Sequence, residues 1–186
     1  NKTGYRFKFI DLGGGMGISY EKNNKNFNFK VFNNLINIFL KKHNSKIIFE
    51  PGRSIIGNSG ILISKIIYIK KNKNKNFIIL DAAMNDFMRK ALYGANHQII
   101  PSIKNGRILH KKFEFVGPIC ESTDKFLTLN KFQLLKEQDL IIICDVGAYG
   151  MSLASNYNVR PFPAEILVKN SRVQIIRSRQ KLSDLI

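Results

Sequence analysis

Residues 50–53, Glu-Pro-Gly-Arg, could place opposite charges in one pocket, because they follow the apolar residues 47–49 at the end of a predicted strand. Proline fixes φ, and glycine lets the main chain come close to a ligand. The carboxylate and the guanidinium on either side of such a turn can then bind one ligand. An ordinary strand-ending turn with a surface ion pair has the same letters, so these four residues leave both interpretations open.

A second motif could bind an anion. Four glycines fill residues 13–17 except for Met16, directly after the predicted strand at residues 6–12. Successive N–H groups of such a loop can converge on a phosphate. The motif is not a dinucleotide fingerprint, because the sixth position from its start is Ile18, and no Gly-Lys-Ser/Thr follows as in a Walker loop. A plain flexible turn is the alternative.

Two further loops follow predicted strands and carry side chains that can do chemistry. Cys120 and Glu121 come after the strand at residues 112–116, so a thiol adjoins a carboxylate. Tyr149 follows the strand at residues 139–144, among small residues that could leave its hydroxyl accessible. A half-buried loop thiol and a packed aromatic ring are the alternatives, and both stay open.

The elements around the first two motifs must bring them together. Apolar residues between the motifs recur with helical spacing at Phe32, Leu35, Ile36, Phe39 and Leu40. A strand, a loop, this helix and the strand at residues 46–49 form a βαβ unit, whose strands lie parallel and end at the same edge. Ligands bind at that edge in α/β folds. The glycine run and the Glu-Pro-Gly-Arg motif are therefore expected to face one pocket.

Beyond residue 58 the pattern changes to strands. Residues 61–70 and 77–81 predict a hairpin. Residues 86–93 predict one or two helical turns, which would put Arg89 and Tyr93 on one face at i and i+4. Short strands at regular intervals predict a β-barrel or sandwich, and the remaining candidates are residues 112–116, 139–144, 164–168 and 173–177.

Composition limits the class of protein. The 186 residues suit one domain or somewhat more, and the net charge of +17 comes from lysines that lie with asparagine, as in residues 70–76. These lysines are not interleaved with aromatic or arginine residues, so we interpret them as solvated surface and expect neither nucleic acid nor membrane as partner. The two cysteines make no disulfide framework, which favours a reducing compartment, and the three histidines have no metal-site spacing.

Taken together, five stretches resemble the C-terminal part of diaminopimelate decarboxylases, a family of pyridoxal-phosphate enzymes in the alanine-racemase-like fold class. They occur in the family's order: DLGGGMGISY (11–20), EPGRSIIGNSG (50–60), DAAMNDFMRKALYGA (81–95), VGPICESTD (116–124) and DVGAYGMSLASNYNVRPFPAEILV (145–168). One such motif would be weak, whereas five in register are highly specific.

The resemblance implies an α/β plus all-β fold. Residues 1–53 would be the last strand–helix–strand part of a (β/α)8 barrel that binds pyridoxal 5'-phosphate, and residues 54–186 a β-barrel or Greek-key-like domain. It also implies a cytoplasmic homodimer of lysine biosynthesis that removes CO2 from meso-2,6-diaminopimelate and yields L-lysine.

The family's functional residues map onto matching positions of this sequence. The implied cofactor contacts are Gly13, Gly14, Gly15, Glu50, Gly52, Arg53 and Tyr149. The implied substrate contacts are Arg53, Arg89, Tyr93, Glu121 and Tyr149. Cys120 corresponds to the family's proton donor, and the family's pattern puts Cys120 and Glu121 into the active site of the partner subunit.

The residue types suit these roles. A carboxylate at Glu50 favours the protonated pyridine ring, which is the electron sink for decarboxylation. A thiol at Cys120 can act as a general acid near neutral pH. Arg89 suits the second carboxylate of diaminopimelate, and Glu121 suits the ammonium beside it.

One departure from the family concerns the Schiff-base lysine of an early barrel strand, which no lysine here matches. Because the chain also lacks an initiator Met, we expect it to begin inside a longer protein and to be inactive alone. Two alternatives remain: another basic-amino-acid decarboxylase, for ornithine, arginine or carboxynorspermidine, and a non-catalytic fragment that binds a decarboxylase protomer. Arg89 favours diaminopimelate, because a substrate without a distal carboxylate leaves a buried arginine nothing to bind.

Overall fold

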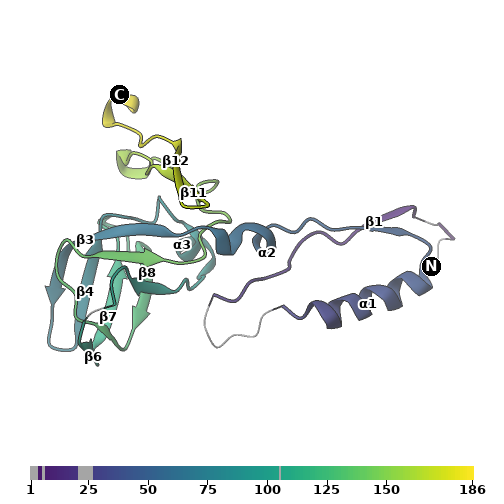
Figure 1. Cartoon of the computed structure of the whole chain (residues 1–186), viewed down its shortest axis with the longest axis horizontal. Coiled ribbons are helices and arrows are strands. Elements are labelled where there is room, and N and C mark those ends of the chain that lie inside the picture. Colours follow the sequence, from purple (N-terminus) through teal and green to yellow (C-terminus); the bar gives the residue numbers. More distant parts are fainter. Residues whose placement is uncertain (1–3, 6, 21–26, 105) are drawn as a thin grey trace.

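The chain folds into an arm and a sheet body (Figure 1). The computed structural model describes residues 4, 5, 7–20, 27–104 and 106–186. Arg6, the first residue of the strand predicted at residues 6–12, lies outside the described residues.

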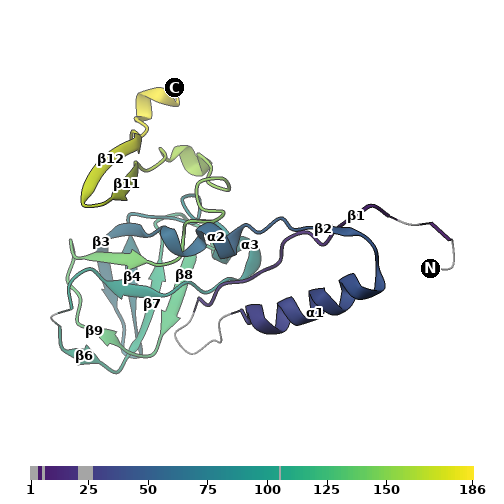
Figure 2. The same ribbon diagram turned by 45° about the vertical axis from the view of Figure 1, so that its right-hand side comes forward.

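The arm is a βαβ unit made of β1 (Phe9–Asp11), α1 (Phe29–Lys42) and β2 (Lys46–Ile48). The strands are parallel, with Phe9 opposite Lys46 and Asp11 opposite Ile48, and α1 runs along one side of the pair (Figure 2). This confirms the predicted strand–helix–strand order and the parallel pairing. Both strands are shorter than predicted.

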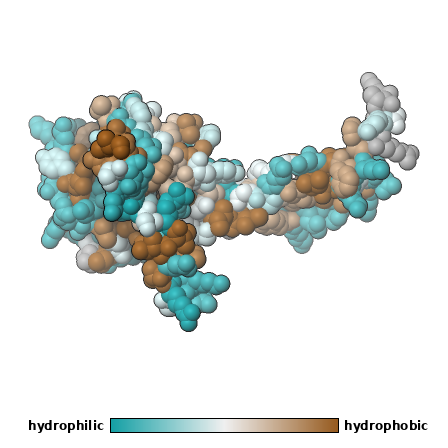
Figure 3. All heavy atoms as spheres, turned by 90° about the horizontal axis from the view of Figure 1, so that it is seen from above, coloured by the Kyte–Doolittle hydropathy of each residue, from teal (hydrophilic) through white to brown (hydrophobic). Residues whose placement is uncertain are grey.

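Helix α1 forms where its apolar spacing predicts it. The side chain of Asn28 accepts a hydrogen bond of 3.0 Å from the Val31 N–H and caps the first turn, and Lys41 and Lys42 occupy the last turn, where positive charge suits the helix dipole. No residue of α1 is buried. Apolar side chains are accordingly visible on the surface of the arm as well as on the body (Figure 3). The apolar stripe of α1 thus finds little cover among the described residues.

The body is built on a mixed six-stranded sheet in the order β5-β10-β3-β4-β7-β8. Every neighbouring pair is antiparallel except β4 and β7, which are parallel. The bounds of its strands are β3 (Leu62–Lys71), β4 (Lys75–Leu80), β5 (Ile99–Pro101), β7 (Lys112–Val116), β8 (Lys125–Leu129) and β10 (Leu140–Ile143). The predicted hairpin is confirmed as β3 and β4, and the strand predicted at residues 112–116 is β7.

The sheet curves around a single core. Ile99 lies in β5 at one edge of the sheet and Phe126 in β8 at the other, yet both belong to the same buried cluster as Ile143 and Phe115. Phe126 and Ile143 also line one small space together with Phe87. Because side chains from both edge strands meet, the sheet is nearly closed, in agreement with the coarse prediction of a β-barrel or sandwich.

Shorter elements complete the body. These are α2 (Arg53–Ile56), η1 (Gly57–Ser59), α3 (Arg89–Tyr93), β6 (Ile108–Leu109), β9 (Phe132–Gln133), η2 (Tyr157–Val159), β11 (Glu165–Lys169), β12 (Arg172–Arg177) and η3 (Leu182–Asp184). The helix predicted at residues 86–93 is too long, because only its second half is helical. β11 and β12 confirm the last two predicted strands and form a hairpin, which an ion pair between Glu165 and Arg177 closes. Within the described ranges, no helix has the length and apolarity needed to span a membrane.

Candidate active site

The glycine run at residues 13–17 and the Glu-Pro-Gly-Arg turn at residues 50–53 meet at the carboxyl ends of β1 and β2. We call residues 50–53 the corner. The Glu50 N–H donates a hydrogen bond of 2.8 Å to the Gly13 carbonyl, continuing the pairing of the two strands. A Cβ atom at Gly14 would lie 2.5 Å from the Glu50 carbonyl oxygen, so only glycine allows this approach. The expectation that both motifs lie at one edge is confirmed.

Gly13 has the backbone conformation that the turn after β1 requires. Its N–H donates a hydrogen bond of 2.7 Å to the Asp11 carboxylate, and its φ of +65° belongs to the left-handed region. Gly15 follows with a φ of +83°. Left-handed residues of this kind can turn successive N–H groups toward a common point, as in anion-binding nests.

Tyr149 lies at the same corner, although it is far from Gly52 in the sequence. Its hydroxyl oxygen would lie 2.7 Å from a Cβ atom at Gly52, so the ring stands directly against the main chain of the corner. Tyr149 itself has a φ of 57° and is about half exposed. The tyrosine predicted to touch both cofactor and substrate therefore adjoins the residues predicted to bind the cofactor.

The segment after Arg53 holds the Tyr149 loop in place. The Val146 N–H donates to the Gly60 carbonyl at 2.9 Å, and the Gly147 N–H donates to the Gly57 carbonyl at 3.0 Å. These bonds join the α2–η1 segment to the loop that follows β10. Arg53 is the first residue of α2, so the same segment that carries this guanidinium also fixes Tyr149.

Arg89 is buried at the junction of arm and body. Its side chain is 3% exposed, its Nη1 atom donates to the Tyr20 hydroxyl, and its guanidinium carbon lies 5.1 Å from the Tyr20 ring centre and 6.0 Å from that of Tyr149. Tyr93, in contrast, is 67% exposed. The helix ends at Gly94, so the two residues predicted to share a face have different environments.

The Cys120 loop forms a separate group. Cys120 and Glu121 are both exposed, and Glu121 accepts a hydrogen bond of 2.5 Å from the Tyr157 hydroxyl. This hydrogen bond, together with the charge of Glu121, raises the pKa of Tyr157. Side chains of this loop form hydrogen bonds with Tyr157 and Met84.

The structure thus brings together some predicted site residues and not others. One group gathers around the corner: Gly13, Gly14, Gly15, Glu50, Gly52, Arg53, Arg89 and Tyr149. Cys120, Glu121 and Tyr93 are instead exposed to solvent. Sequence reasoning missed Tyr20 and Tyr157, although both fall inside stretches that it had singled out.

A buried carboxylate links the two groups. The Asp124 carboxylate accepts hydrogen bonds from the Met84 N–H at 2.7 Å and from the Ile119 N–H at 2.8 Å. It therefore fastens the Cys120 loop to the segment that leads into Arg89. Burial raises the pKa of Asp124, while the two N–H groups oppose that shift.

Arg160 holds the same segment from the C-terminal side. Its Nε atom donates to the Asn85 side chain at 2.9 Å, and its Nη2 atom lies 3.5 Å from the Asp86 carboxylate. Burial raises the pKa of Asp86, and the charge of Arg160 works against that rise. The turn before Arg89 is thus fixed by polar contacts from two distant parts of the chain.

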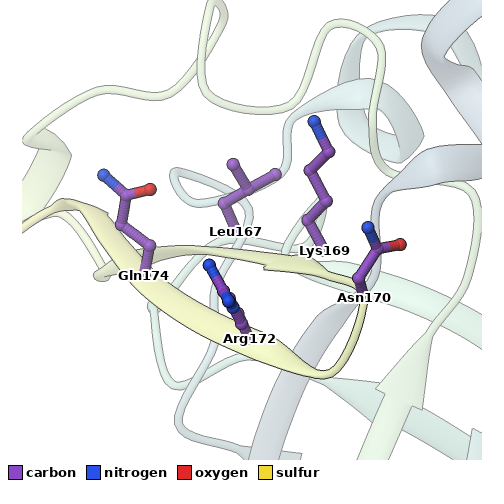
Figure 4. Close-up of a pocket in the computed structure, with 5 residues that line it drawn as sticks. All are labelled: Leu167, Lys169, Asn170, Arg172 and Gln174. Carbon is purple, nitrogen blue, oxygen red and sulfur yellow. The ribbon is translucent and has the colours of Figure 1, made fainter.

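A hollow of about 520 Å³ lies outside this site, on one face of the β11–β12 hairpin. Figure 4 shows that its lining side chains all project from that face. None of the predicted site residues lines it. The described residues contain no group of three or more His, Cys, Asp or Glu side chains that could hold a metal ion.

The sequence and fold of this chain are similar to those of known proteins. The family described as "Pyridoxal-dependent decarboxylase, C-terminal sheet domain" matches residues 18–147, which is more than half of the chain. The chain belongs to this family.

Several curated relatives and solved structures that are similar to this chain are named diaminopimelate decarboxylase. A diaminopimelate decarboxylase of Aquifex aeolicus is 40% identical over 182 residues, which cover 96% of this chain and 42% of that protein. The crystal structure of diaminopimelate decarboxylase from Helicobacter pylori complexed with L-lysine is 42% identical with a TM-score of 0.86, and covers 96% of this chain and 43% of that one. The structure of the enzyme from M. jannaschi gives a TM-score of 0.89 at 34% identity, with coverage of 99% and 43%. This chain therefore spans less than half the length of the relatives that it matches.

Proposed function

We propose that the full-length protein carrying this chain decarboxylates meso-2,6-diaminopimelate to L-lysine and CO2 with pyridoxal 5'-phosphate. The observation that carries the proposal is the corner itself, where the glycine run, Glu50 and Gly52 share one edge with the hydroxyl of Tyr149. The relatives named diaminopimelate decarboxylase support the same substrate. A substrate that lacks the distal carboxylate, such as ornithine or arginine, gives no reason for a buried Arg89.

The residues fit a cofactor that has a phosphate and a pyridine ring. Because the Gly13 N–H already binds Asp11, Gly14 and Gly15 are the better donors for the phosphate, and Gly13 shapes the loop. Glu50 follows at the same edge and offers a carboxylate to the ring nitrogen. Gly52, Arg53 and Tyr149 border the space that the pyridine ring would occupy. When bound, pyridoxal phosphate supplies the electron sink that takes up the pair of electrons left by CO2.

The side chains of this protein then have distinct tasks. Arg89 holds the carboxylate at the far end of the substrate, because a planar guanidinium binds a carboxylate through two parallel hydrogen bonds. Glu121 holds the ammonium group beside that carboxylate, and Tyr93 borders the entrance. After the bond to CO2 breaks, the Cys120 thiol gives its proton to the same carbon atom, and the thiolate regains a proton from solvent.

The exposure of the Cys120 loop supports a homodimer. Both Cys120 and Glu121 are exposed, so a second copy of the protein could receive them in its own corner. We therefore propose a site shared between subunits, in which residues 1–53 belong to a (β/α)8 barrel and residues 54–186 to the sheet domain. The unpaired thiols Cys120 and Cys144 support a cytoplasmic location.

Two experiments test the proposal on the full-length protein. Release of CO2 is measured from meso-diaminopimelate, ornithine and arginine, and a preference for ornithine or arginine would contradict the substrate assignment. Two inactive variants, Cys120→Ser and Glu50→Gln, are then mixed and allowed to exchange subunits. Because a mixed dimer has one intact site, activity should return on mixing. If it does not, Cys120 does not act across the dimer.

A further inference from the structure

Two buried nitrogen atoms beside the corner have no hydrogen-bond partner among the residues that the structure describes. They are Nε of Arg89 and Nε2 of His97, and the two residues are only 3% and 4% exposed. Buried polar atoms are almost always paired, because an unpaired one has lost its bonds to water without replacement. The function proposed above uses the terminal amino groups of Arg89 but gives no role to His97.

The hydrogen bonding of His97 determines which of its nitrogens carries the proton. Its Nδ1 atom lies 2.9 Å from the carbonyl oxygen of Cys144. A carbonyl oxygen only accepts, so Nδ1 must be the protonated nitrogen. Burial lowers the pKa of His97, which keeps the ring neutral near pH 7. In the neutral ring Nε2 is then a bare acceptor.

Arg89 offers the complementary group. Its Nε–H can only donate, and the guanidinium has no acceptor atom. Both side chains pack on Tyr20: the guanidinium carbon lies 5.1 Å from the ring centre of Tyr20, and the His97 ring lies 4.4 Å from it. A donor without an acceptor and an acceptor without a donor thus lie against the same aromatic ring.

We propose that His97 positions Arg89, with Nε2 accepting a hydrogen bond from a buried water molecule to which the Arg89 Nε–H donates. This water bridge and the bond from Nη1 to Tyr20 would fix the plane of the guanidinium and leave its remaining N–H groups for the distal carboxylate. The expected effect on KM rests on the proposed function, whereas the hydrogen-bonded contact between Arg89 and His97 does not.

The other groups around His97 do not compete for Nε2. The Cys144 carbonyl occupies the opposite nitrogen, and Phe87 packs edge-on against the ring at 4.6 Å. The charged groups nearby are Arg89, Asp145 after β10, and Lys90, which lines the same small space as His97. The positive charge of Arg89 disfavours a second proton on the ring, which keeps the acceptor available at neutral pH.

The first test uses kinetics of the full-length enzyme. His97→Phe keeps a ring against Tyr20 and Phe87 but removes both nitrogens, and His97→Gln restores an acceptor oxygen near the position of Nε2. We expect His97→Phe to raise KM for diaminopimelate about tenfold, with a smaller change in kcat, and His97→Gln to recover most of that loss. His110→Phe, at an exposed position, is the matched control. A KM unchanged in His97→Phe would overturn the proposal.

The second test needs no activity. In the full-length protein labelled with 15N-histidine, His97 should show a protonated Nδ1 and an unprotonated Nε2 whose chemical shift is that of a hydrogen-bonded acceptor. Arg89→Met should move the Nε2 resonance toward the value of a free acceptor. An Nε2 resonance already at the free value in the unaltered protein, or one that Arg89→Met does not move, would overturn the contact. If the protein fails to decarboxylate diaminopimelate but shows this shift, the proposed function fails and the contact stands.

Discussion

The carboxylate of Asp124 accepts a hydrogen bond of 2.7 Å from the backbone N–H of Met84. The two residues are forty positions apart, and each belongs to a different part of the candidate site. Asp124 ends the loop that carries Cys120, and Met84 lies in the turn before Arg89. One buried side chain therefore holds the Cys120 loop against the segment that carries Arg89.

Replacing Asp124 by asparagine should loosen this link. An amide has one carbonyl oxygen for two N–H groups and turns its own NH2 toward one of them, so we expect a loss of about 1–3 kcal/mol in the free energy of unfolding. Urea denaturation of the full-length protein measures it. The control is Asp184→Asn, because Asp184 also accepts from a backbone N–H, that of Lys181, but in an exposed turn. Equal midpoints for Asp124→Asn and the unaltered protein would contradict the link.

The contact between Gly52 and Tyr149 can be tested with a double-mutant cycle. In Gly52→Ala the new methyl group would lie 2.7 Å from the Tyr149 hydroxyl, so the ring must move and the affinity for pyridoxal phosphate should fall about ten- to a hundredfold. In Gly52→Ala/Tyr149→Phe the next ring atom is 3.5 Å away, an ordinary contact, and part of the affinity should return. Cofactor titration followed by absorbance measures all four proteins. If the losses in cofactor affinity of the two single variants simply add up in the double variant, the two residues do not contact each other.

A second set of charges stabilises the sheet away from the site. Glu114, in β7, is 8% exposed and binds Lys125 and Lys75 of the neighbouring strands. The hydrogen bonds from Lys125 and then Lys75 lower the pKa of Glu114 below its usual 4.5. The folded state therefore releases this proton more readily than the unfolded state, and the resulting stability is complete above pH 4.5 and is lost as the pH falls through the lowered pKa.

Glu114→Gln should accordingly cost about 1 kcal/mol at pH 7, since both lysines are partly exposed and screened by solvent. The difference between the variant and the unaltered protein should shrink when denaturation is repeated below pH 4.5. Glu165→Gln removes the more exposed pair with Arg177 and should change stability much less. A difference that grows on acidification would contradict the assignment.

Local sequence patterns were sufficient for the arm and for much of the sheet. The helical spacing of α1 and the alternation of β3, β4 and β7 are properties of neighbouring residues, and the parallel pairing of β1 and β2 follows from the helix between them. The meeting of the glycine run with Glu50 could therefore be predicted. The short α2 could not, because its four residues carry too few apolar positions for a period to be visible.

The parts of the site that escaped prediction depend on contacts between distant residues. Arg89 and Tyr93 have helical spacing, but α3 is only five residues long and ends at Gly94 with a φ of 65°, which leaves Tyr93 at the exposed end. His97 has no neighbour in the sequence that marks it as a partner of Arg89, and Tyr20 is 69 residues away from that arginine. The position of Tyr20 within the matched stretch at residues 11–20 was the only signal for it.

Tyr157 gives a final prediction about the Cys120 loop. Its hydroxyl donates to Glu121 at 2.5 Å, and the pKa of Tyr157 is raised first by this hydrogen bond and then by the negative charge of Glu121. Tyr157→Phe should release the Glu121 carboxylate and raise KM for diaminopimelate roughly three- to tenfold, with a smaller effect on kcat. Stability should not change, because Tyr157 is 45% exposed.

The phenol titration supplies a readout that does not depend on substrate. In the unaltered protein, ultraviolet absorbance should show a tyrosine that ionises at unusually high pH, because the Glu121 carboxylate holds its phenol proton. This late transition should be missing from Tyr157→Phe. Tyr68→Phe, on the exposed surface of β3, should leave that late transition in place. If the late transition persists in Tyr157→Phe and KM is unchanged, the hydroxyl of Tyr157 does not hold Glu121. The proposed ammonium-binding role of Glu121 must then rest on contacts supplied by the partner subunit.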